Sequence, residues 1–186
     1  MNVMIVGVGG QGTLLTSRII GKVALEGGYD VKISEVHGMA QRGGSVVTFV
    51  RFGERVSEPV VEENGADLLI AFEKLEAYRY AHYLKKDGIL VVNDCRIDPM
   101  TVTIGAAEYP ENIIEELQNG HTVYALNAET AAKTLGNSKV VNSIMLGKAA
   151  RYMPFEKEKW LQAVKETVPQ KTVELNERAF LLGYGE

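Results

Sequence analysis

The sequence predicts an α/β fold: a three-layer, Rossmann-like mixed sheet, mostly parallel with one antiparallel strand, followed by a helical carboxyl-terminal region. Three observations indicate this class. Short apolar runs alternate with helix-period segments up to about residue 138, one apolar run lies too near its predecessor for a parallel crossover, and helical patterns alone follow residue 139. With 186 residues, 46% of them apolar, we expect a single domain spanning residues 1–186.

The first unit has the pattern strand, helix, strand. An apolar run at 3–6 precedes a helix over 13–26 with an apolar stripe at a spacing of about four residues, and Gly27-Gly28 ends that helix before a second strand at 31–36. Two strands joined in this way point in the same direction. Their carboxyl ends then lie at one edge of the sheet, where ligands bind in open α/β folds.

The next run, 45–52, is rich in Val and Phe and reads as a strand. Only about eight residues separate it from the second strand, whereas a parallel crossover needs about a dozen or more. We therefore expect it to run antiparallel. The remaining predicted elements are strand 67–72, helix 73–84, strand 88–93, a helix from Pro110 toward Gly120, strand 122–126, helix 128–135 capped by Asn127, and helices 140–152, 155–168 and 171–182.

A first glycine-rich segment follows the first strand and opens the first helix. Gly7, Gly9 and Gly12 fit the pattern G-x-G-x-x-G. Free N–H groups and the positive end of the helix dipole favour a phosphate at such a turn. Glu35, near the end of the second strand, is placed to accept a hydrogen bond from a ribose hydroxyl. The pattern also fits a tight turn that needs glycine only for packing.

A second glycine-rich segment, His37 to Gly44, stands where a dinucleotide half-domain has its second crossover helix. The guanidinium of Arg42 suits a carboxylate or phosphate, the alternative being an exposed arginine at a hairpin tip. Met39 is either an apolar contact for a partner or a packing side chain. His37 shares a strand face with Glu35, but no residue is assigned as catalytic. The candidate binding residues are Gly7, Gly9, Gly10, Gln11, Gly12, Glu35, His37, Met39, Gln41, Arg42, Gly43, Gly44 and Ser45.

Composition excludes several classes of function. The formal charge of −4 comes without a basic stripe, so neither nucleic acid nor a membrane surface is an expected partner. No apolar run approaches the roughly 20 residues of a membrane helix, and we expect a cytoplasmic protein. Cys95 is the only cysteine, so this chain alone holds no iron-sulfur cluster, and we predict no metal site. Asp94 and Arg96 are expected to form a loop ion pair.

The two motifs together resemble a known family. G-V-G-G-Q-G at 7–12 and H-G-M-A-Q-R-G-G-S at 37–45 look like the gamma subunit, or gamma domain, of 2-oxoacid:ferredoxin oxidoreductases, the pyruvate/ketoacid ferredoxin oxidoreductase family. The resemblance spans nearly the whole chain. The wording at residues 39–42 is closest to the indolepyruvate type, whose small subunit is sometimes called beta.

The resemblance implies an oxidative decarboxylation that converts a 2-oxoacid, coenzyme A and oxidised ferredoxin into an acyl-CoA, carbon dioxide and reduced ferredoxin. Thiamine diphosphate and iron-sulfur clusters carry that chemistry. The chain lacks a G-D-G thiamine signature and has one cysteine, so both cofactors belong on a large partner subunit and the isolated chain is expected to be inactive. Our hypothesis is that the two glycine-rich segments close over the partner's cofactor site and help receive coenzyme A, with N–H groups from 9–12 and the charge of Arg42.

Two other functions fit the residues. One is a stand-alone NAD-dependent oxidoreductase with Glu35 as the ribose ligand, and the other is a nucleotide-sensing module without enzymatic activity. The sequence leaves open which 2-oxoacid is used and the order of the strands. A small subunit separated from its complex can pair through exposed apolar surface, so a homodimer is one form open to the isolated chain.

Overall fold

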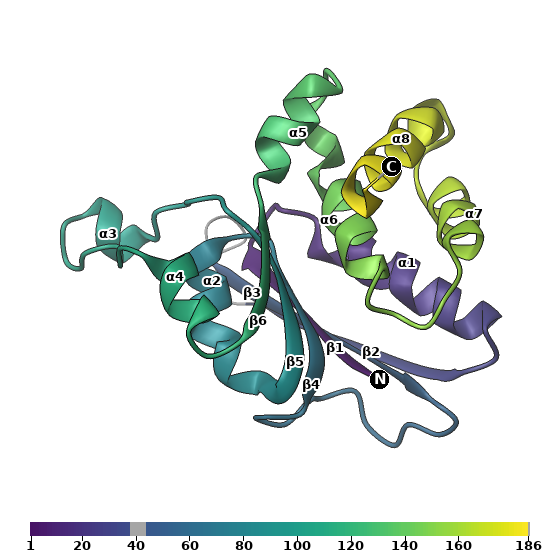
Figure 1. The fold of residues 1–186 in the computed structure, drawn as a ribbon, viewed down its shortest axis with the longest axis horizontal. Coiled ribbons are helices and arrows are strands. Elements are labelled where there is room, and N and C mark those ends of the chain that lie inside the picture. The colour runs from purple at the N-terminus through teal and green to yellow at the C-terminus, as the bar shows by residue number, and fades with distance from the viewer. Residues whose placement is uncertain (38–43, 186) are drawn as a thin grey trace.

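The computed structural model describes residues 1–37 and 44–185, and its described part holds a six-stranded sheet with helices on both faces (Figure 1). The strand order is β2-β3-β1-β4-β5-β6. The strands are β1 Asn2–Val8, β2 Asp30–His37, β3 Ser45–Gly53, β4 Ala66–Ala71, β5 Leu84–Asn93 and β6 Thr122–Leu126.

One strand runs against the others. β3 pairs antiparallel with both β1 and β2, whereas β1 with β4, β4 with β5, and β5 with β6 are parallel pairs. The predicted mixed sheet with one antiparallel strand is confirmed. β3 lies between β1 and β2, so these two strands point the same way without being neighbours. Their carboxyl ends, and those of β4 to β6, therefore share one edge of the sheet, which we call the carboxyl edge.

The side chains of β1 alternate between two cores, as expected for a strand buried on both faces. Val3 and Ile5 pack in the core with α1, and Met4 and Val6 pack in the core with α2. On the α1 face lie α1 Thr13–Glu26, α5 Ala128–Thr134, α6 Val141–Ala150, α7 Lys157–Thr167 and α8 Val173–Tyr184. The predicted helical carboxyl-terminal region is confirmed, and it covers this face of the sheet.

α6 and α8 cross at very close range. A Cβ built on Gly147 would lie 2.0 Å from the carbonyl oxygen of Phe180, and one built on Gly183 would lie 1.9 Å from that of Ile144. Only glycine permits such an approach of two helix backbones. Phe180 of α8 and Trp160 of α7 both lie fully buried in the core of the α1 face.

The opposite face carries α2 Lys74–Tyr80, a 3₁₀ turn Ala81–Tyr83, and α4 Ile113–Gln118, with the short helix α3 Met100–Thr103 projecting beside them (Figure 1). The expected helix over 73–84 is too long, since β5 already begins at Leu84. Pairing of Leu84 with Ala66, followed by a register shift, overrides the helical pattern there. α3 was not predicted, and α4 begins three residues after Pro110.

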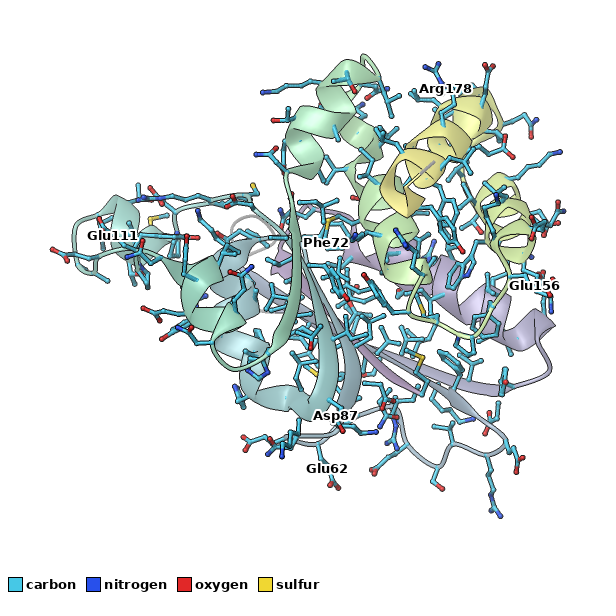
Figure 2. The ribbon with its side chains drawn as sticks, viewed as in Figure 1. Glu62, Phe72, Asp87, Glu111, Glu156 and Arg178 are labelled. Carbon is cyan, nitrogen blue, oxygen red and sulfur yellow. The ribbon has the colours of Figure 1, made fainter. Side chains whose placement is uncertain are left out.

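The charged residues labelled in Figure 2 lie at the periphery of the molecule. Figure 2 shows Phe72 near the centre of the molecule, directly after β4, while Glu62 and Asp87 lie toward the opposite end of the strands. Within the described ranges, none of the helices has the length and apolar character needed to cross a bilayer.

Candidate functional site

The two glycine-rich segments meet at the carboxyl edge. The amide N–H of Gly9 donates to the carbonyl oxygen of Gly44 at 2.8 Å, and Val8 pairs with Ser45 in the β1–β3 register. The described ends of both segments therefore lie side by side. Four predicted site residues, Met39, Gln41, Arg42 and Gly43, lie outside the described residues, as does the side chain of His37.

The first segment is held in shape by its own glutamine. Gln11 Oε1 accepts from the Val8 amide at 2.8 Å, and Gln11 Nε2 donates to the Phe72 carbonyl at 2.9 Å. A Cβ on Gly7 would lie 2.9 Å from Gln11 Oε1, so glycine leaves room for that side chain. The oxygen and the nitrogen of the Gln11 amide are thus both hydrogen-bonded within the chain, and these two bonds fix the conformation of the turn.

The turn delivers the start of α1 to the same edge. Gly10 and Gly12 have φ of +100° and +79°, and Gly12 is the N-cap residue without any side-chain cap. The first N–H groups of an α-helix have no partner within the helix. The Leu15 amide donates to the Gly12 carbonyl at 3.1 Å. The positive end of the α1 dipole lies at this corner of the edge, a place where proteins commonly bind anions.

A pocket of about 510 Å³ borders this corner. Gly10 and Gln11 form one wall, the start of α6 and its preceding turn form another, and Glu129 of α5 contributes a carboxylate whose Oε2 is buried. The lining combines backbone, hydroxyl, ammonium, amide and carboxylate groups. Its residues are Gly10, Gln11, Ile97, Glu129, Ser138, Lys139, Val141 and Asn142.

Glu35 lies farther from the first turn than a dinucleotide half-domain would place it. Adjacent strands are about 4.8 Å apart, so with β3 intervening the axis of β2 runs about 10 Å from that of β1. The Glu35 carboxylate accepts a hydrogen bond from Thr48 of β3 at 3.3 Å. His37 is the last residue of β2 and pairs with Val46.

Ser45 joins the second segment to α2. Its hydroxyl donates to Glu76 Oε2 at 2.5 Å, and Arg79 donates to the other oxygen of Glu76 at 2.7 Å. The Tyr80 hydroxyl lies 3.2 Å from the same Ser45 oxygen. Burial raises the pKa of the Glu76 carboxyl above its ordinary value, against the lowering effects of Ser45 and Arg79.

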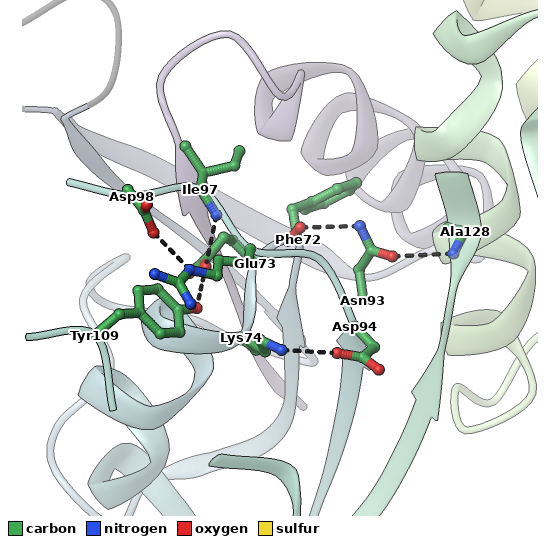
Figure 3. Close-up of polar contacts among 10 residues, drawn as sticks. Phe72, Glu73, Lys74, Asn93, Asp94, Ile97, Asp98, Tyr109 and Ala128 are labelled. Carbon is green, nitrogen blue, oxygen red and sulfur yellow. Dashed lines mark hydrogen bonds and ion pairs between the residues drawn. The ribbon is translucent and has the colours of Figure 1, made fainter. Parts of the chain in front are cut away.

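The neighbouring carboxylate, Glu73, holds a different segment (Figure 3). It caps α2 by accepting from the Glu76 amide at 2.9 Å, and its Oε1 accepts from the Ile97 amide and the Tyr109 hydroxyl at 3.1 and 2.5 Å. Burial and this bond to Glu73 raise the pKa of Tyr109. The two ends of the segment that carries α3 are thereby attached to the carboxyl edge.

Asn93, the last residue of β5, closes the network (Figure 3). Its Nδ2 donates to the Phe72 carbonyl at 3.0 Å, and its Oδ1 accepts from the Ala128 amide at 3.0 Å. The same Nδ2 donates to Glu129 at 2.9 Å. Phe72 O therefore accepts from both Gln11 and Asn93. The first glycine-rich turn is thus attached to the Phe72 carbonyl directly, and the start of α5 is attached to it through Asn93.

The predicted ion pair between Asp94 and Arg96 is wrong. Asp94 contacts Lys74 at 3.2 Å, and Arg96 pairs with Asp98 at 2.6 Å while its guanidinium lies 4.3 Å from the centre of the Tyr109 ring. α2 brings a lysine to Asp94 from a distant part of the sequence, and Tyr109 attracts Arg96 to the other side. The Lys74–Asp94 contact is not encoded in the local spacing, whereas Arg96 pairs with an acid two residues away on its other side.

Sequence reasoning also missed Glu73, Glu76, Glu129, Lys139 and Asn142. A usable signal existed for the first of these, since Glu73 lies two residues after the end of the buried strand β4, and Asn93 is the last residue of β5. Polar residues at such positions point to the carboxyl edge. Among residues 1–37 and 44–185, no group of three or more His, Cys, Asp or Glu is arranged to hold a metal ion.

These features define a Rossmann-like α/β protein in which the start of α1 and the described ends of two glycine-rich segments lie at one edge of the sheet. The family model described as pyruvate ferredoxin/flavodoxin oxidoreductase matches residues 2–186, and the chain belongs to this family. The indolepyruvate oxidoreductase subunit IorB of Archaeoglobus fulgidus is 43% identical over 191 residues, which cover 100% of this chain and 94% of the relative. The IorB subunit of Thermococcus kodakarensis is 41% identical over 189 residues, covering 98% and 93%.

A solved structure agrees with this assignment. The gamma subunit of a keto/oxoacid ferredoxin oxidoreductase from Geobacter sulfurreducens superposes with a TM-score of 0.73 at 26% identity, covering 98% of this chain and 95% of that one. The resemblance found in the sequence is thus confirmed. The chain is a small subunit of the 2-oxoacid:ferredoxin oxidoreductase type, an enzyme class built from several subunits.

Proposed function

We propose that the chain serves an indolepyruvate-type 2-oxoacid:ferredoxin oxidoreductase by presenting its carboxyl edge to the large subunit, where it closes the thiamine diphosphate site and positions coenzyme A. The observation that carries the proposal is the Gly9–Gly44 hydrogen bond, which joins the two motif segments into one surface. The indolepyruvate assignment is supported by IorB relatives above 40% identity over nearly the whole chain.

The donor set fits the chemistry of coenzyme A, which carries phosphate, hydroxyl and amide groups. The uncapped start of α1 and the ammonium of Lys139 suit a phosphate, and Ser138, Asn142 and Glu129 suit hydroxyl or amide groups in the adjoining pocket. In the second segment, Arg42 supplies a further positive charge, and Met39, Gln41 and Gly43 its contact surface. We assign no catalytic residue to this chain.

Thiamine diphosphate, bound on the large subunit, supplies the carbanion-stabilising chemistry, and iron-sulfur clusters there pass electrons to ferredoxin. The residues of this chain orient the second substrate and exclude water at the junction. Such positioning contributes to the rate because it converts a bimolecular encounter into a prearranged one.

The test uses the complex of this chain with its large subunit. Arg42→Ala and Lys139→Ala should each raise the KM for coenzyme A by about tenfold or more, the size expected for loss of a charged hydrogen bond. Arg55→Ala is the matched control, an exposed arginine in the turn after β3, away from the carboxyl edge. Unchanged KM and unchanged subunit affinity in both test variants would contradict the proposal.

Two further measurements separate the alternatives. Calorimetry of the isolated chain with NAD should show no tight binding, whereas tight binding that Glu35→Ala abolishes would favour a nicotinamide enzyme. Turnover of the complex with indolepyruvate, other aryl 2-oxoacids and pyruvate should give the highest kcat/KM for an aryl substrate. Preference for pyruvate would overturn the substrate assignment.

A further inference from the structure

We propose that Glu76 is a positioning residue that acts through Ser45 to hold Gly44, the described end of the second glycine-rich segment, against the first segment. The inference deepens the proposed function, because it names the contact that shapes the surface offered to coenzyme A. It assigns a purpose to a buried carboxylate on α2 that lies away from both motifs in the sequence.

Ser45 and its neighbour Gly44 form the junction of three elements. The Gly44 carbonyl accepts from the Gly9 amide, the Ser45 backbone pairs with Val8, and the Ser45 hydroxyl donates to Glu76. The first two contacts attach the segment to β1, and the third attaches it to α2. Two consecutive residues thus set where the second segment leaves the sheet.

Burying the Glu76 carboxylate costs more free energy than burying an apolar side chain that would serve for packing alone. Its side chain is 3% exposed, whereas that of its partner Arg79 is 43% exposed, so the carboxylate is desolvated while its counter-charge remains partly in water. An apolar side chain at a buried site avoids this penalty. Burial raises the pKa of Glu76, as expected for such a cost. Costly polar groups are found where they fix a functional geometry.

The first turn of α2 also holds a second segment at the carboxyl edge, the one between Ile97 and Tyr109. Glu73 accepts from the Ile97 amide and the Tyr109 hydroxyl, and it accepts from the Glu76 amide as the cap of α2. Two carboxylates three residues apart therefore attach two segments to one rigid helix start. Sites supported in this way keep their geometry before the ligand arrives.

The first test measures hydrogen exchange in the full-length chain. The Gly9 amide donates to Gly44, so its exchange reports directly on the junction. Glu76→Ala and Ser45→Ala should each speed the exchange of the Gly9 amide by about tenfold or more. The double variant should exchange little faster than either single variant, because both substitutions remove the same Ser45–Glu76 hydrogen bond. Glu76→Gln should retain most of the protection, since an amide can still hydrogen-bond Ser45.

The matched control is Glu115→Ala, an exposed acidic position on α4 of the same face, which should leave Gly9 exchange unchanged. Exchange of amides in β4 should stay the same in all folded variants. If Gly9 exchange is unchanged in Ser45→Ala and Glu76→Ala, the positioning inference is wrong.

The second test uses the complex with the large subunit. Glu76→Ala and Ser45→Ala should raise the KM for coenzyme A severalfold with a smaller effect on kcat, and Glu76→Gln should restore the KM. Faster Gly9 exchange with an unchanged KM would support the positioning inference and count against the proposed coenzyme A surface. Failure of the positioning inference and failure of the proposed coenzyme A surface therefore give different results.

Discussion

Asn142 of α6 donates from Nδ2 to the carbonyl oxygen of Gly12 at 3.2 Å, across 130 positions of the chain. The same nitrogen lies 2.1 Å from where a Cβ on Gly12 would be. The start of α1 is thus fitted against α6 at a position where no side chain is tolerated.

Gly12→Ala should destabilise the chain more than Gly10→Ala. Both residues have positive φ, which costs about 1–2 kcal/mol for alanine, but the space beside Gly10 is open while Gly12 adds a steric conflict of about 1–3 kcal/mol. Urea denaturation of the two variants measures the difference. Adding Asn142→Ala to Gly12→Ala should recover part of the loss, and equal losses in the two single variants would contradict the fit described here.

Much of the fold follows from local pattern. Helix 13–26 and strand 122–126 have the predicted bounds, and Asn127 caps α5 through its side chain as expected. The antiparallel direction of β3 follows from the short connection between β2 and β3 alone. What local pattern does not contain is the insertion of β3 between β1 and β2, because either side of β2 would satisfy the same connection length.

Tyr109→Phe should lower the free energy of unfolding by about 1.5–3 kcal/mol, because the Tyr109 hydroxyl donates to the buried Glu73 carboxylate. Tyr78→Phe is the matched control, since Tyr78 is exposed and its bond to Glu116 faces solvent. Chemical denaturation of both variants provides the measurement. A loss no larger than in the control would show that Glu73 does not depend on this bond.

Cys95 should react slowly with iodoacetamide in the folded chain. Burial, with a further contribution from Glu129, raises the pKa of its thiol to about 12, and only the thiolate is an effective nucleophile. At pH 8 we expect a rate at least about a hundredfold below that of free cysteine. Glu129→Gln should raise the rate, and urea should bring the unmodified chain to the free-cysteine rate. Rapid labelling of the folded chain would contradict this.

The stability of the wild-type chain relative to Glu76→Gln should fall as pH rises. The folded-state pKa of Glu76 is raised above its ordinary value of 4.5, mainly by burial. Such a group stabilises the fold fully below pH 4.5, and this contribution is lost as pH rises through the folded-state pKa. The glutamine side chain of the variant does not ionise, so its contribution to stability does not change with pH. Denaturation of both proteins from pH 4.5 to 8 tests the sign, and a constant or opposite difference would contradict it.

Part of the site can be predicted from the sequence. Both glycine-rich segments were assigned to one edge, since parallel strands bring their ends together, and Gly9 and Gly44 do meet. The position of Glu73 after a buried strand is a usable signal, but its partners are not predictable, and Glu76 acts through Ser45, 31 positions away in the sequence. Such contacts depend on the path of the whole chain and leave no mark in local spacing.

The crossing of α6 and α8 affects how the chain can reach its native state. Each helix carries a glycine that receives a backbone carbonyl of the other, so neither can be seated fully while the other is missing. α6 in turn packs over the sheet beside α1. Consequently part of the apolar α1 face of the sheet stays exposed during synthesis until α8 has left the ribosome, and a chain halted earlier exposes that surface to aggregation.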